Sequence, residues 1–419
     1  MNRLLFTAIL CLASLTGMAQ DYVGLIRNNP AMAASNMTNY HFEDSEYTRA
    51  PKGYDAFYIT HYGRHGSRYQ SSDRYARSIW PLLRKADSLG IFTEAGKTFY
   101  DDFNAVMTEQ HGMYGMLTEL GAQEQRGIAR RMASNFPEVF KGKNGRTKVF
   151  CQSSTVPRCI VSMTNFAHSL DRNTEGLDYV FCTGENYYKR LAYFPKPSPA
   201  VALADAKEDS LRHAVIKPDE IIRHFFSDPQ KAYEMIGDPY SFEADLYLAS
   251  CGGHLTDNGV CLLSYFPEEI LIRNWEARNA RFYLAYGMSH EMEENQREIS
   301  RRLLSDFIVR AEEAVDEGNE VAADFRFGHD TSLLPLIGHI GIEGMNQWPS
   351  FDDVNSVWNS SVSICMGSNI QMVFYRNKAG DVIVKLLYNE KETKIPALEP
   401  FCGPYYKWTE LKAYLQSLL

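Results

Sequence analysis

The sequence predicts an α/β protein, in which helices flank a central, mostly parallel sheet and a mostly helical cap domain is inserted. Two observations predict this fold. First, several short strand-like segments each end in a polar loop that leads into a helix, which is the order typical of a parallel sheet. Second, residues 186–320 lack strand-like alternation and contain long helical stretches, notably residues 274–317, which are rich in Glu, Arg, Ala and Leu.

The individual elements follow from hydrophobic spacing and turn residues. Residues 20–50 are polar and irregular and predict an extended N-terminal arm. Apolar residues recur at helical spacing within 71–90 (Ile79, Leu82, Leu83, Ala86 and Leu89). Two further helices are expected at Thr118–Phe136 and Val156–Leu170. Strands are expected at Asp55–Thr60, Lys148–Cys151, Val321–Phe327, Ile370–Tyr375 and Val382–Tyr388, the last two joined by a turn at 377–380.

The first 19 residues predict a secretory signal peptide. Arg3 supplies the charged region, Leu4–Leu15 the apolar region, and Gly17-Met18-Ala19 the small residues suited to cleavage before Gln20. No later segment has the length and apolar character of a bilayer span. The sequence therefore predicts an exported protein, periplasmic or secreted, with no membrane span.

The composition narrows the class of ligand and the use of cysteine. The 419 residues carry a net charge of −9, which disfavours nucleic acid as a partner, so an anionic small substrate needs a local basic pocket. Eight cysteines are present, and Cys11 lies in the signal peptide. Because export permits disulfides, and a turn-rich segment separates Cys251 from Cys261, this pair is the first candidate for a disulfide. The cysteine spacings give no zinc pattern.

The most informative segment is Arg64-His65-Gly66-Ser67-Arg68, at the end of a predicted strand. A guanidinium group offers planar, bidentate hydrogen bonds that match the oxygens of a phosphoryl group. Gly66 permits a tight turn that brings backbone N–H groups to the same oxygens. His65 carries an imidazole that can attack phosphorus and hold the phosphoryl group covalently. The segment predicts an anion-binding loop that contains a nucleophile.

Two other predicted strands end in chemically suitable residues. Arg158 follows a serine-rich strand exit, and His329-Asp330 follows the strand at 321–327. Taken singly, Arg158 is most simply a surface residue and Asp330 a helix cap. In a parallel sheet, however, the carboxyl ends of the strands meet, so we expect these loops to converge with the first one. His61 is interpreted as a structural histidine or a neighbour of this pocket, because no carboxylate cluster accompanies it as a metal site would require.

These segments together resemble the histidine phosphatase superfamily, in its acid phosphatase and phytase branch. The resemblance rests on Arg64-His65-Gly66 with Arg68, on Leu117-Thr118 with Gly121, on the strand exit at 153–158, and on His329-Asp330. The tail at 404–408 and the block 275–286 are similar to multiple inositol polyphosphate phosphatases, which often carry His-Ala-Glu in place of His-Asp.

The resemblance implies a phosphoglycerate mutase-like fold and a role for each site residue. His65 is expected to be the nucleophile and Asp330 the proton donor. Arg64, Arg68, Arg158 and His329 are expected to bind the substrate phosphate, with no metal ion and no cofactor. The implied activity is that of an exported phosphomonoesterase acting on inositol polyphosphates such as phytate. A broad-specificity acid phosphatase and a catalytically silent protein that binds phosphate or inositol phosphate remain alternatives.

The sequence also predicts how the chain divides into a catalytic α/β domain and a cap. The expected segments are a signal peptide (1–19), three parts of the α/β domain (20–90, 145–185 and 321–419), a helical segment contributing to the cap (91–144) and the mainly helical cap insertion (186–320).

Overall fold

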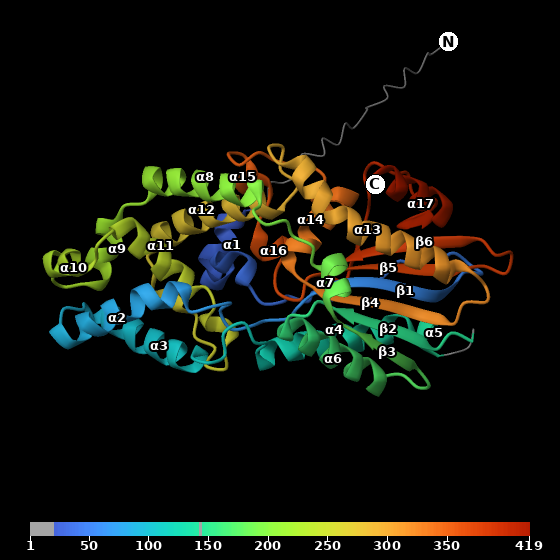
Figure 1. The fold of residues 1–419 in the computed structure, drawn as a ribbon, viewed down its shortest axis with the longest axis horizontal. Coiled ribbons are helices and arrows are strands. Elements are labelled where there is room, and N and C mark those ends of the chain that lie inside the picture. The colour runs from blue at the N-terminus through green and yellow to red at the C-terminus, as the bar shows by residue number, and fades with distance from the viewer. Residues whose placement is uncertain (1–20, 142–144) are drawn as a thin grey trace, which may run out of the picture.

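The computed structural model describes residues 21–141 and 145–419. The predicted signal peptide lies outside these residues. Figure 1 shows an elongated molecule, with a sheet and its covering helices at one end and a lobe made of helices at the other. In the described part of the chain, no helix combines the length and the hydropathy that crossing a bilayer requires.

The sheet has eight strands in the order β3-β2-β4-β1-β5-β6-β7, and β8 pairs with β6. The bounds are β1 Asp55–Arg64, β2 Lys148–Ser153, β3 Asp178–Cys182, β4 Val321–Gly328, β5 Asn369–Arg376, β6 Val382–Tyr388, β7 Lys391–Thr393 and β8 Tyr405–Lys407. Strands β3, β2, β4 and β1 are parallel to one another, whereas β5 to β8 join in antiparallel pairs. The predicted α/β class with a centrally parallel sheet is confirmed.

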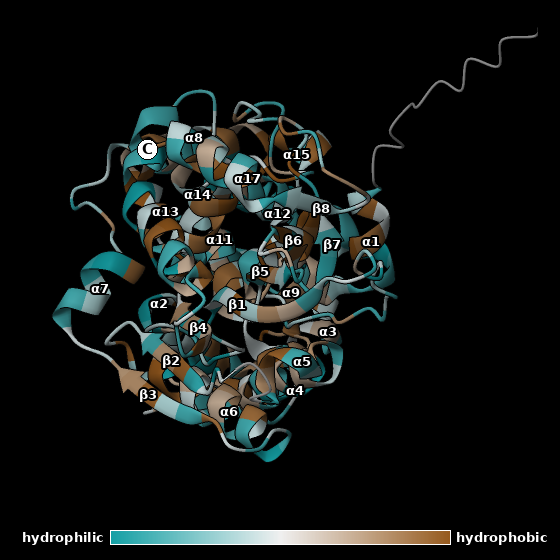
Figure 2. Cartoon of the chain, turned by 90° about the vertical axis from the view of Figure 1, so that its right-hand side faces the viewer, coloured by the Kyte–Doolittle hydropathy of each residue, from teal (hydrophilic) through white to brown (hydrophobic). Residues whose placement is uncertain are grey.

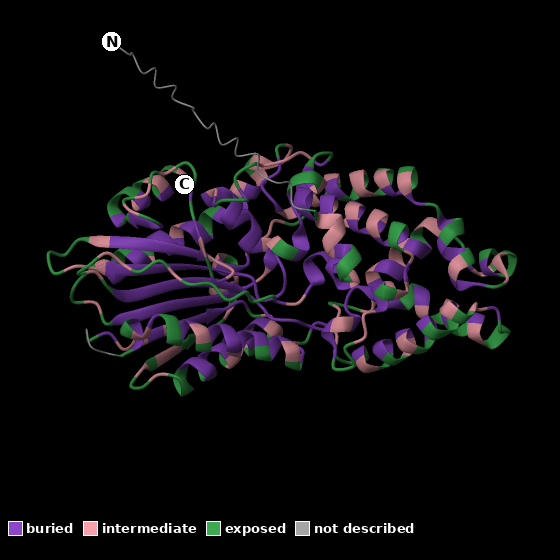
Figure 3. Cartoon of the chain, turned by 180° about the vertical axis from the view of Figure 1, so that it is seen from behind, coloured by how far each residue is buried: buried purple, intermediate pink, exposed green. Residues whose placement is uncertain are grey.

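Helices cover both faces of the sheet, as the view along it in Figure 2 shows. Helices α13 (Glu293–Val315), α14 (Asp330–Ile340) and α17 (Trp408–Ser417) share one hydrophobic core with β1 and β4 to β6. Helices α4 (Glu119–Asn135), α5 (Pro137–Phe140) and α6 (Pro157–Arg172) form the core of the opposite face. Strands β1 and β4 are therefore buried along nearly their whole length (Figure 3), which is typical of a sheet covered on both sides.

The helical lobe has a core of its own. Its helices are α2 (Arg74–Leu89), α3 (Glu94–Gln110), α8 (Pro199–Val215), α9 (Pro218–Phe225), α10 (Pro229–Met235), α11 (Pro239–Ser250) and α12 (Glu268–Tyr286). The lobe is thus built from two stretches of chain, one before β2 and one after β3. Within the predicted segment 91–144, α3 lies in the lobe, whereas α4 and α5 pack against the sheet.

The N-terminal arm differs from its prediction. Residues 22–37 form helix α1 (Tyr22–Asn28) and the 3-10 helix η1 (Pro30–Met37), and every residue from Ala31 to Met37 is buried. The extended prediction was wrong because a short run of alanine and methionine packs into the core of the lobe, although its neighbours are polar.

Two further predictions need correction. The predicted helical stretch 274–317 is divided, because α12 ends at Tyr286 and α13 begins at Glu293. The predicted disulfide is absent, since all seven cysteines of the described residues are free. Cys251 lies at the end of α11. Its thiol donates a hydrogen bond to the carbonyl oxygen of Tyr247, in the same helix, at 3.3 Å instead of bonding to Cys261.

Candidate active site

The three loops that the sequence singled out converge at the carboxyl ends of adjacent parallel strands. Strand β4 lies between β2 and β1, with Arg64 opposite Gly328 and Ser153 opposite Phe327 in register. The backbone N–H of His65 continues the ladder by donating to the carbonyl oxygen of Gly328 at 3.0 Å. The chain therefore brings its candidate nucleophile next to the His329 loop.

The start of helix α4 packs against the loop 64–68 and forms hydrogen bonds with it. Glu124 accepts hydrogen bonds at 2.7 Å from both the backbone N–H and the hydroxyl of Ser67. Thr118, which caps the helix, donates to the carbonyl oxygen of Ser67 at 3.0 Å. A side chain at Gly66 would collide with the backbone of Gly121, and the reverse also holds. The spacing of Thr118 and Gly121 thus serves close packing of the helix start against the loop.

The start of helix α6 also forms a hydrogen bond with this loop. The hydroxyl of Ser162 accepts a hydrogen bond from the backbone N–H of Gly66 at 3.1 Å. Arg158, in the first turn of α6, donates to the carbonyl oxygen of Gly115 at 3.4 Å. The serine-rich strand exit therefore positions both a support of the loop and a third arginine.

The three arginines form a cluster with unused donors, in which Arg64 and Arg68 are buried and Arg158 is half-buried. Arg64 is fully buried and donates through Nη1 to the carbonyl oxygens of Asn36 at 2.6 Å and Ile364 at 2.7 Å. The Nε atoms of Arg64, Arg68 and Arg158 are buried without a hydrogen-bond partner in the described structure. Burial, followed by the charges of Arg158 and Arg64, lowers the pKa of Arg68 to about 9. An anion placed among these groups would satisfy the free donors and relieve their repulsion.

The ring of His65 is held in one tautomer. Its Nδ1 lies 2.9 Å from the carbonyl oxygen of Gly66. A carbonyl oxygen only accepts, so Nδ1 carries the proton and Nε2 keeps its lone pair. Burial and the surrounding positive charges, Arg158 first, hold the pKa of His65 well below its usual range. The imidazole is therefore neutral, which is the form that can act as a nucleophile.

His329 lies beside this ring, with the two ring centroids 5.7 Å apart. Its Nε2 is 3.2 Å from the hydroxyl of Ser154, and burial together with Arg158 lowers its pKa to about 3. The Cys159 thiol lies 3.7 Å from the same nitrogen, and burial raises its pKa to about 11, so it stays protonated. Both neighbours of the ring are therefore neutral polar groups.

Asp330 opens helix α14 and is ion-paired. Its Oδ2 lies 2.8 Å from Nη2 of Arg64 and accepts a hydrogen bond from Nδ2 of Asn36 at 2.7 Å. Burial alone would raise the pKa of Asp330, but Arg64, Asn36 and His329 outweigh burial and hold it below the ordinary value. The carboxyl group is therefore ionised while Arg64 is its partner.

A small cavity of about 90 Å³ opens beside these residues and includes Arg68 and Asn36 in its wall. Its far side comes from the helical lobe, through Leu248 and Cys251 at the end of α11 and Arg278 on α12. The site therefore lies where the lobe meets the carboxyl ends of the strands.

The structure thus brings together all six residues that the sequence singled out: Arg64, His65, Arg68, Arg158, His329 and Asp330. Sequence reasoning missed Asn36, which lies in the arm predicted to be extended, and Glu124, whose position next to the Thr118 motif was the only available signal. His61 lies on β1 and stacks on Phe166 with ring centroids 5.5 Å apart. No set of three or more metal-ligating side chains is gathered within residues 21–141 and 145–419.

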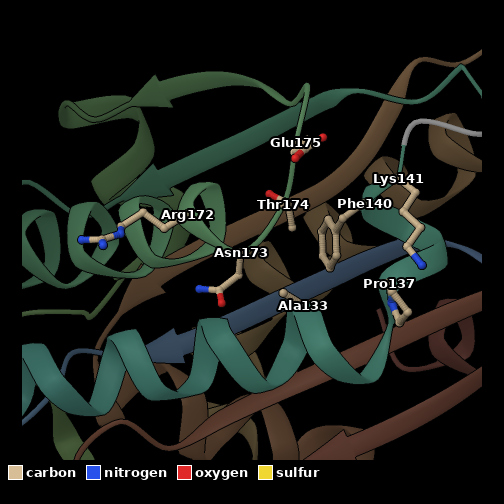
Figure 4. Close-up of a pocket in the computed structure, with 8 residues that line it drawn as sticks. All are labelled: Ala133, Pro137, Phe140, Lys141, Arg172, Asn173, Thr174 and Glu175. Atoms are coloured by element: carbon tan, nitrogen blue, oxygen red, sulfur yellow. The ribbon is translucent and has the colours of Figure 1, made fainter.

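Figure 4 shows a larger cavity, of about 430 Å³, whose lining includes none of the six candidate site residues. Its walls come from the end of α4, from α5 and from the loop after α6, and include Arg172 and Glu175. Helices α4 and α6 both begin at the loops of the candidate active site, so their ends lie at the opposite edge of the sheet. This cavity is therefore no part of the candidate active site.

Comparison with solved structures identifies the fold. No family model matches the chain, and no curated protein matches it by sequence. The multiple inositol polyphosphate phosphatase of Bifidobacterium longum, in complex with inositol hexasulfate, superposes with a TM-score of 0.74 at 22% identity, over 92% of this chain and 97% of that one. The phytase of D. castellii superposes with a TM-score of 0.71 at 13% identity, over 94% and 86%. The chain therefore has the fold of these phosphatases. Its sequence motifs are similar to those of the same branch.

Proposed function

We propose that this protein is an exported phosphomonoesterase that acts through a phosphohistidine at His65. The observation that carries the proposal is the state of His65, a neutral imidazole with a free Nε2, held among three guanidinium groups with unused donors. Few functions other than transfer of a phosphoryl group use a nucleophile inside an anion-binding cluster.

In the first step, Nε2 of His65 attacks the phosphorus of a monoester. The P–N bond forms while the P–O bond to the leaving group breaks, and Asp330 donates its proton to the departing oxygen, which leaves as an alcohol. Arg64, Arg68, Arg158 and His329 bind the equatorial oxygens and stabilise the charge that spreads over them in the transition state.

In the second step, water releases the phosphate. Asp330, now a carboxylate, accepts a proton from a water molecule whose oxygen attacks phosphorus. The P–N bond breaks, inorganic phosphate leaves, and His65 returns to its neutral form. The atoms and charges balance over the two steps without any other reactant.

The ionised state of Asp330 in the free site determines how the proton arrives. A phosphate monoester has a second pKa near roughly 6, so its monoanion predominates in mildly acidic solution. When the monoester binds, its oxygens take over Arg64, the pKa of Asp330 rises, and the proton of the monoanion passes to the carboxyl group. Activity should therefore be highest at mildly acidic pH.

Inositol polyphosphates are the favoured substrate class. The fold is that of a protein described as a multiple inositol polyphosphate phosphatase and of phytases. Arg278 of the helical lobe lines the same cavity as Arg68 and offers a site for a second phosphate group. A broad-specificity acid phosphatase is the second candidate, because a cavity of about 90 Å³ suits a small monoester.

The test is release of phosphate between pH 4 and 8 without added metal. Phytate and p-nitrophenyl phosphate are compared for the full mature protein, for His65→Ala, and for His290→Ala, which removes an exposed histidine as a control. We expect much higher specific activity on phytate, abolished in His65→Ala and kept in His290→Ala. Preference for the small ester would support the second candidate. Activity that survives His65→Ala would overturn the mechanism.

A further inference from the structure

Asn36 makes two contacts with the catalytic groups, one through its backbone and one through its side chain. Its carbonyl oxygen accepts a hydrogen bond from Nη1 of Arg64 at 2.6 Å. Its amide Nδ2 donates to Oδ2 of Asp330 at 2.7 Å. Arg64 Nη2 lies 2.8 Å from the same oxygen. One residue therefore holds both the expected proton donor and the phosphate-binding arginine that pairs with it.

The backbone before Asn36 is strained in a way that fixes this placement. Ser35 is buried and has φ 56° and ψ −134°, a conformation that residues other than glycine rarely adopt. Its hydroxyl lies 2.7 Å from the hydroxyl of Ser360, and the Ser361 hydroxyl donates to the carbonyl oxygen of Met32. Tyr247 of the helical lobe donates to the carbonyl oxygen of Ala33 at 2.6 Å. Contacts on several sides thus hold the strained arm in place.

The hydrogen bonds of the Asp330 carboxyl group determine which oxygen can carry the transferable proton. Oδ2 already receives two donors, from Asn36 and Arg64, and cannot present a proton to either of them. Within the described residues, Oδ1 accepts the backbone N–H of Thr331 at 2.9 Å and no other hydrogen bond. The acid proton is therefore placed on Oδ1 for as long as the Asn36 amide occupies Oδ2.

We propose that Asn36 is a positioning residue for the proton donor, whose amide fixes the Asp330 carboxyl group so that Oδ1 carries the proton given to the leaving group. This inference rests on the proposed phosphomonoesterase function. It assigns a step of that reaction to the N-terminal arm. Because Asn36 acts through Asp330, its removal should matter only where the leaving group needs a proton.

The experiment compares two esters that differ in this need. An alkyl ester, β-glycerol phosphate, leaves as a poor anion and requires the acid, whereas p-nitrophenolate is a stable anion and leaves without it. For Asn36→Ala, which keeps the backbone contact with Arg64, we expect kcat/KM on the alkyl ester to fall about 10-fold or more. On p-nitrophenyl phosphate we expect a change of less than about twofold, since only the acid-dependent step is weakened.

Two further variants separate positioning from folding. Asn36→Leu has a similar size, removes the amide donor and adds no charge, and should show the same selective loss. Asn28→Ala, at the exposed end of α1, is the matched control and should leave both activities unchanged. Thermal unfolding of each variant reports whether it folds as the natural chain does.

A double-mutant cycle with Asp330→Asn gives the decisive result. Once the proton donor is gone, Asn36→Ala should cause no additional loss on the alkyl ester, because the two residues act as one unit. Equal losses on both esters, or an additional loss in the Asp330→Asn background, would overturn the inference while the proposed function stands. If the natural chain hydrolyses neither these esters nor phytate, the proposed function fails and this inference fails with it.

Discussion

Replacing His61 by leucine should make the protein more resistant to acid. His61 lies on β1, 1% exposed, among Phe166, Phe325 and Phe327, with ring centroids 5.5 to 5.8 Å from its own. Its Nδ1 has no hydrogen-bond partner in the described structure. Burial, and secondarily the charge of Arg326, lowers the pKa of His61 to about 3. The histidine therefore stays neutral in the fold over the whole pH range of the proposed activity.

The magnitude follows from the difference between the folded and unfolded pKa. An unfolded histidine binds a proton below its ordinary pKa of 6.5, whereas folded His61 does so only near 3. The free energy of unfolding therefore falls as pH drops from 6.5 towards 3. At pH 5 this amounts to about 2 kcal/mol, because each pH unit of difference is worth about 1.4 kcal/mol. Leucine, of similar volume and without a titrating group, removes this loss.

Chemical unfolding at pH 7 and pH 5 measures the effect. At pH 7 we expect His61→Leu to lie within ~1 kcal/mol of the natural chain, since an unsatisfied polar atom is exchanged for an apolar one. Between pH 7 and pH 5 the natural chain should lose about 2 kcal/mol more than the variant does. His290→Gln, at an exposed position, is the control and should follow the natural chain. An identical pH dependence in His61→Leu and the natural chain would refute the reasoning.

Three further results are expected from the site. Arg278→Ala should raise KM for phytate by about 10-fold and leave KM for p-nitrophenyl phosphate within about twofold. Only phytate has a second phosphate that can contact this guanidinium. Equal changes in KM for the two substrates would show that Arg278 does not bind the second phosphate. The lowered pKa values of His65 and Asp330 keep the imidazole neutral and the carboxyl group ionised in mild acid. We therefore expect kcat/KM for an alkyl ester to rise as pH falls from 7 to 5 and to decline only in stronger acid. A flat profile of kcat/KM from pH 4 to 9 would contradict the mechanism. Glu124→Gln should lower kcat/KM for alkyl and aryl esters alike, on the order of 100-fold. The two carboxylate oxygens accept the backbone N–H groups of Ser67 and Tyr40, so the amide must turn a donor towards one of them, which displaces the loop. A loss confined to alkyl esters would instead assign Glu124 to proton transfer.

The sequence predicted most of the elements that build the catalytic loops. The strand at 55–60 and the helices at 118–136 and 156–170 carry strong local patterns, because buried strands are apolar and a threonine cap precedes the helix at 119. The convergence of three loops followed from the general geometry of parallel sheets. The strand order that brings it about, with β4 between β2 and β1, has no local sequence signal.

The features that sequence reasoning missed depend on long-range contacts. Asn36 is 294 residues from Asp330, and nothing in its surroundings distinguishes it from other asparagines. The arm that carries it folds as α1 and η1 because it is buried between the lobe and the C-terminal segment, not because its helix propensity is high. The helical lobe likewise combines α2 and α3 with helices that come after β3, a pairing that chain order conceals.

The balance of charges in the site links the Arg64–Asp330 ion pair to the proposed proton transfer. Arg64 and Arg68 are buried and Arg158 is half-buried, and Asp330 is the carboxylate that forms an ion pair with Arg64. Glu124 instead accepts hydrogen bonds from Ser67 and from the backbone N–H of Tyr40, and within the described residues it forms no ion pair with these arginines. Burial, followed by the charges of Arg158 and Arg64, lowers the pKa of Arg68, so a negative charge placed among these arginines would stabilise them. A bound phosphate supplies that charge and competes with Asp330 for Arg64. Substrate binding itself therefore releases the carboxyl group to accept the proton that the reaction requires.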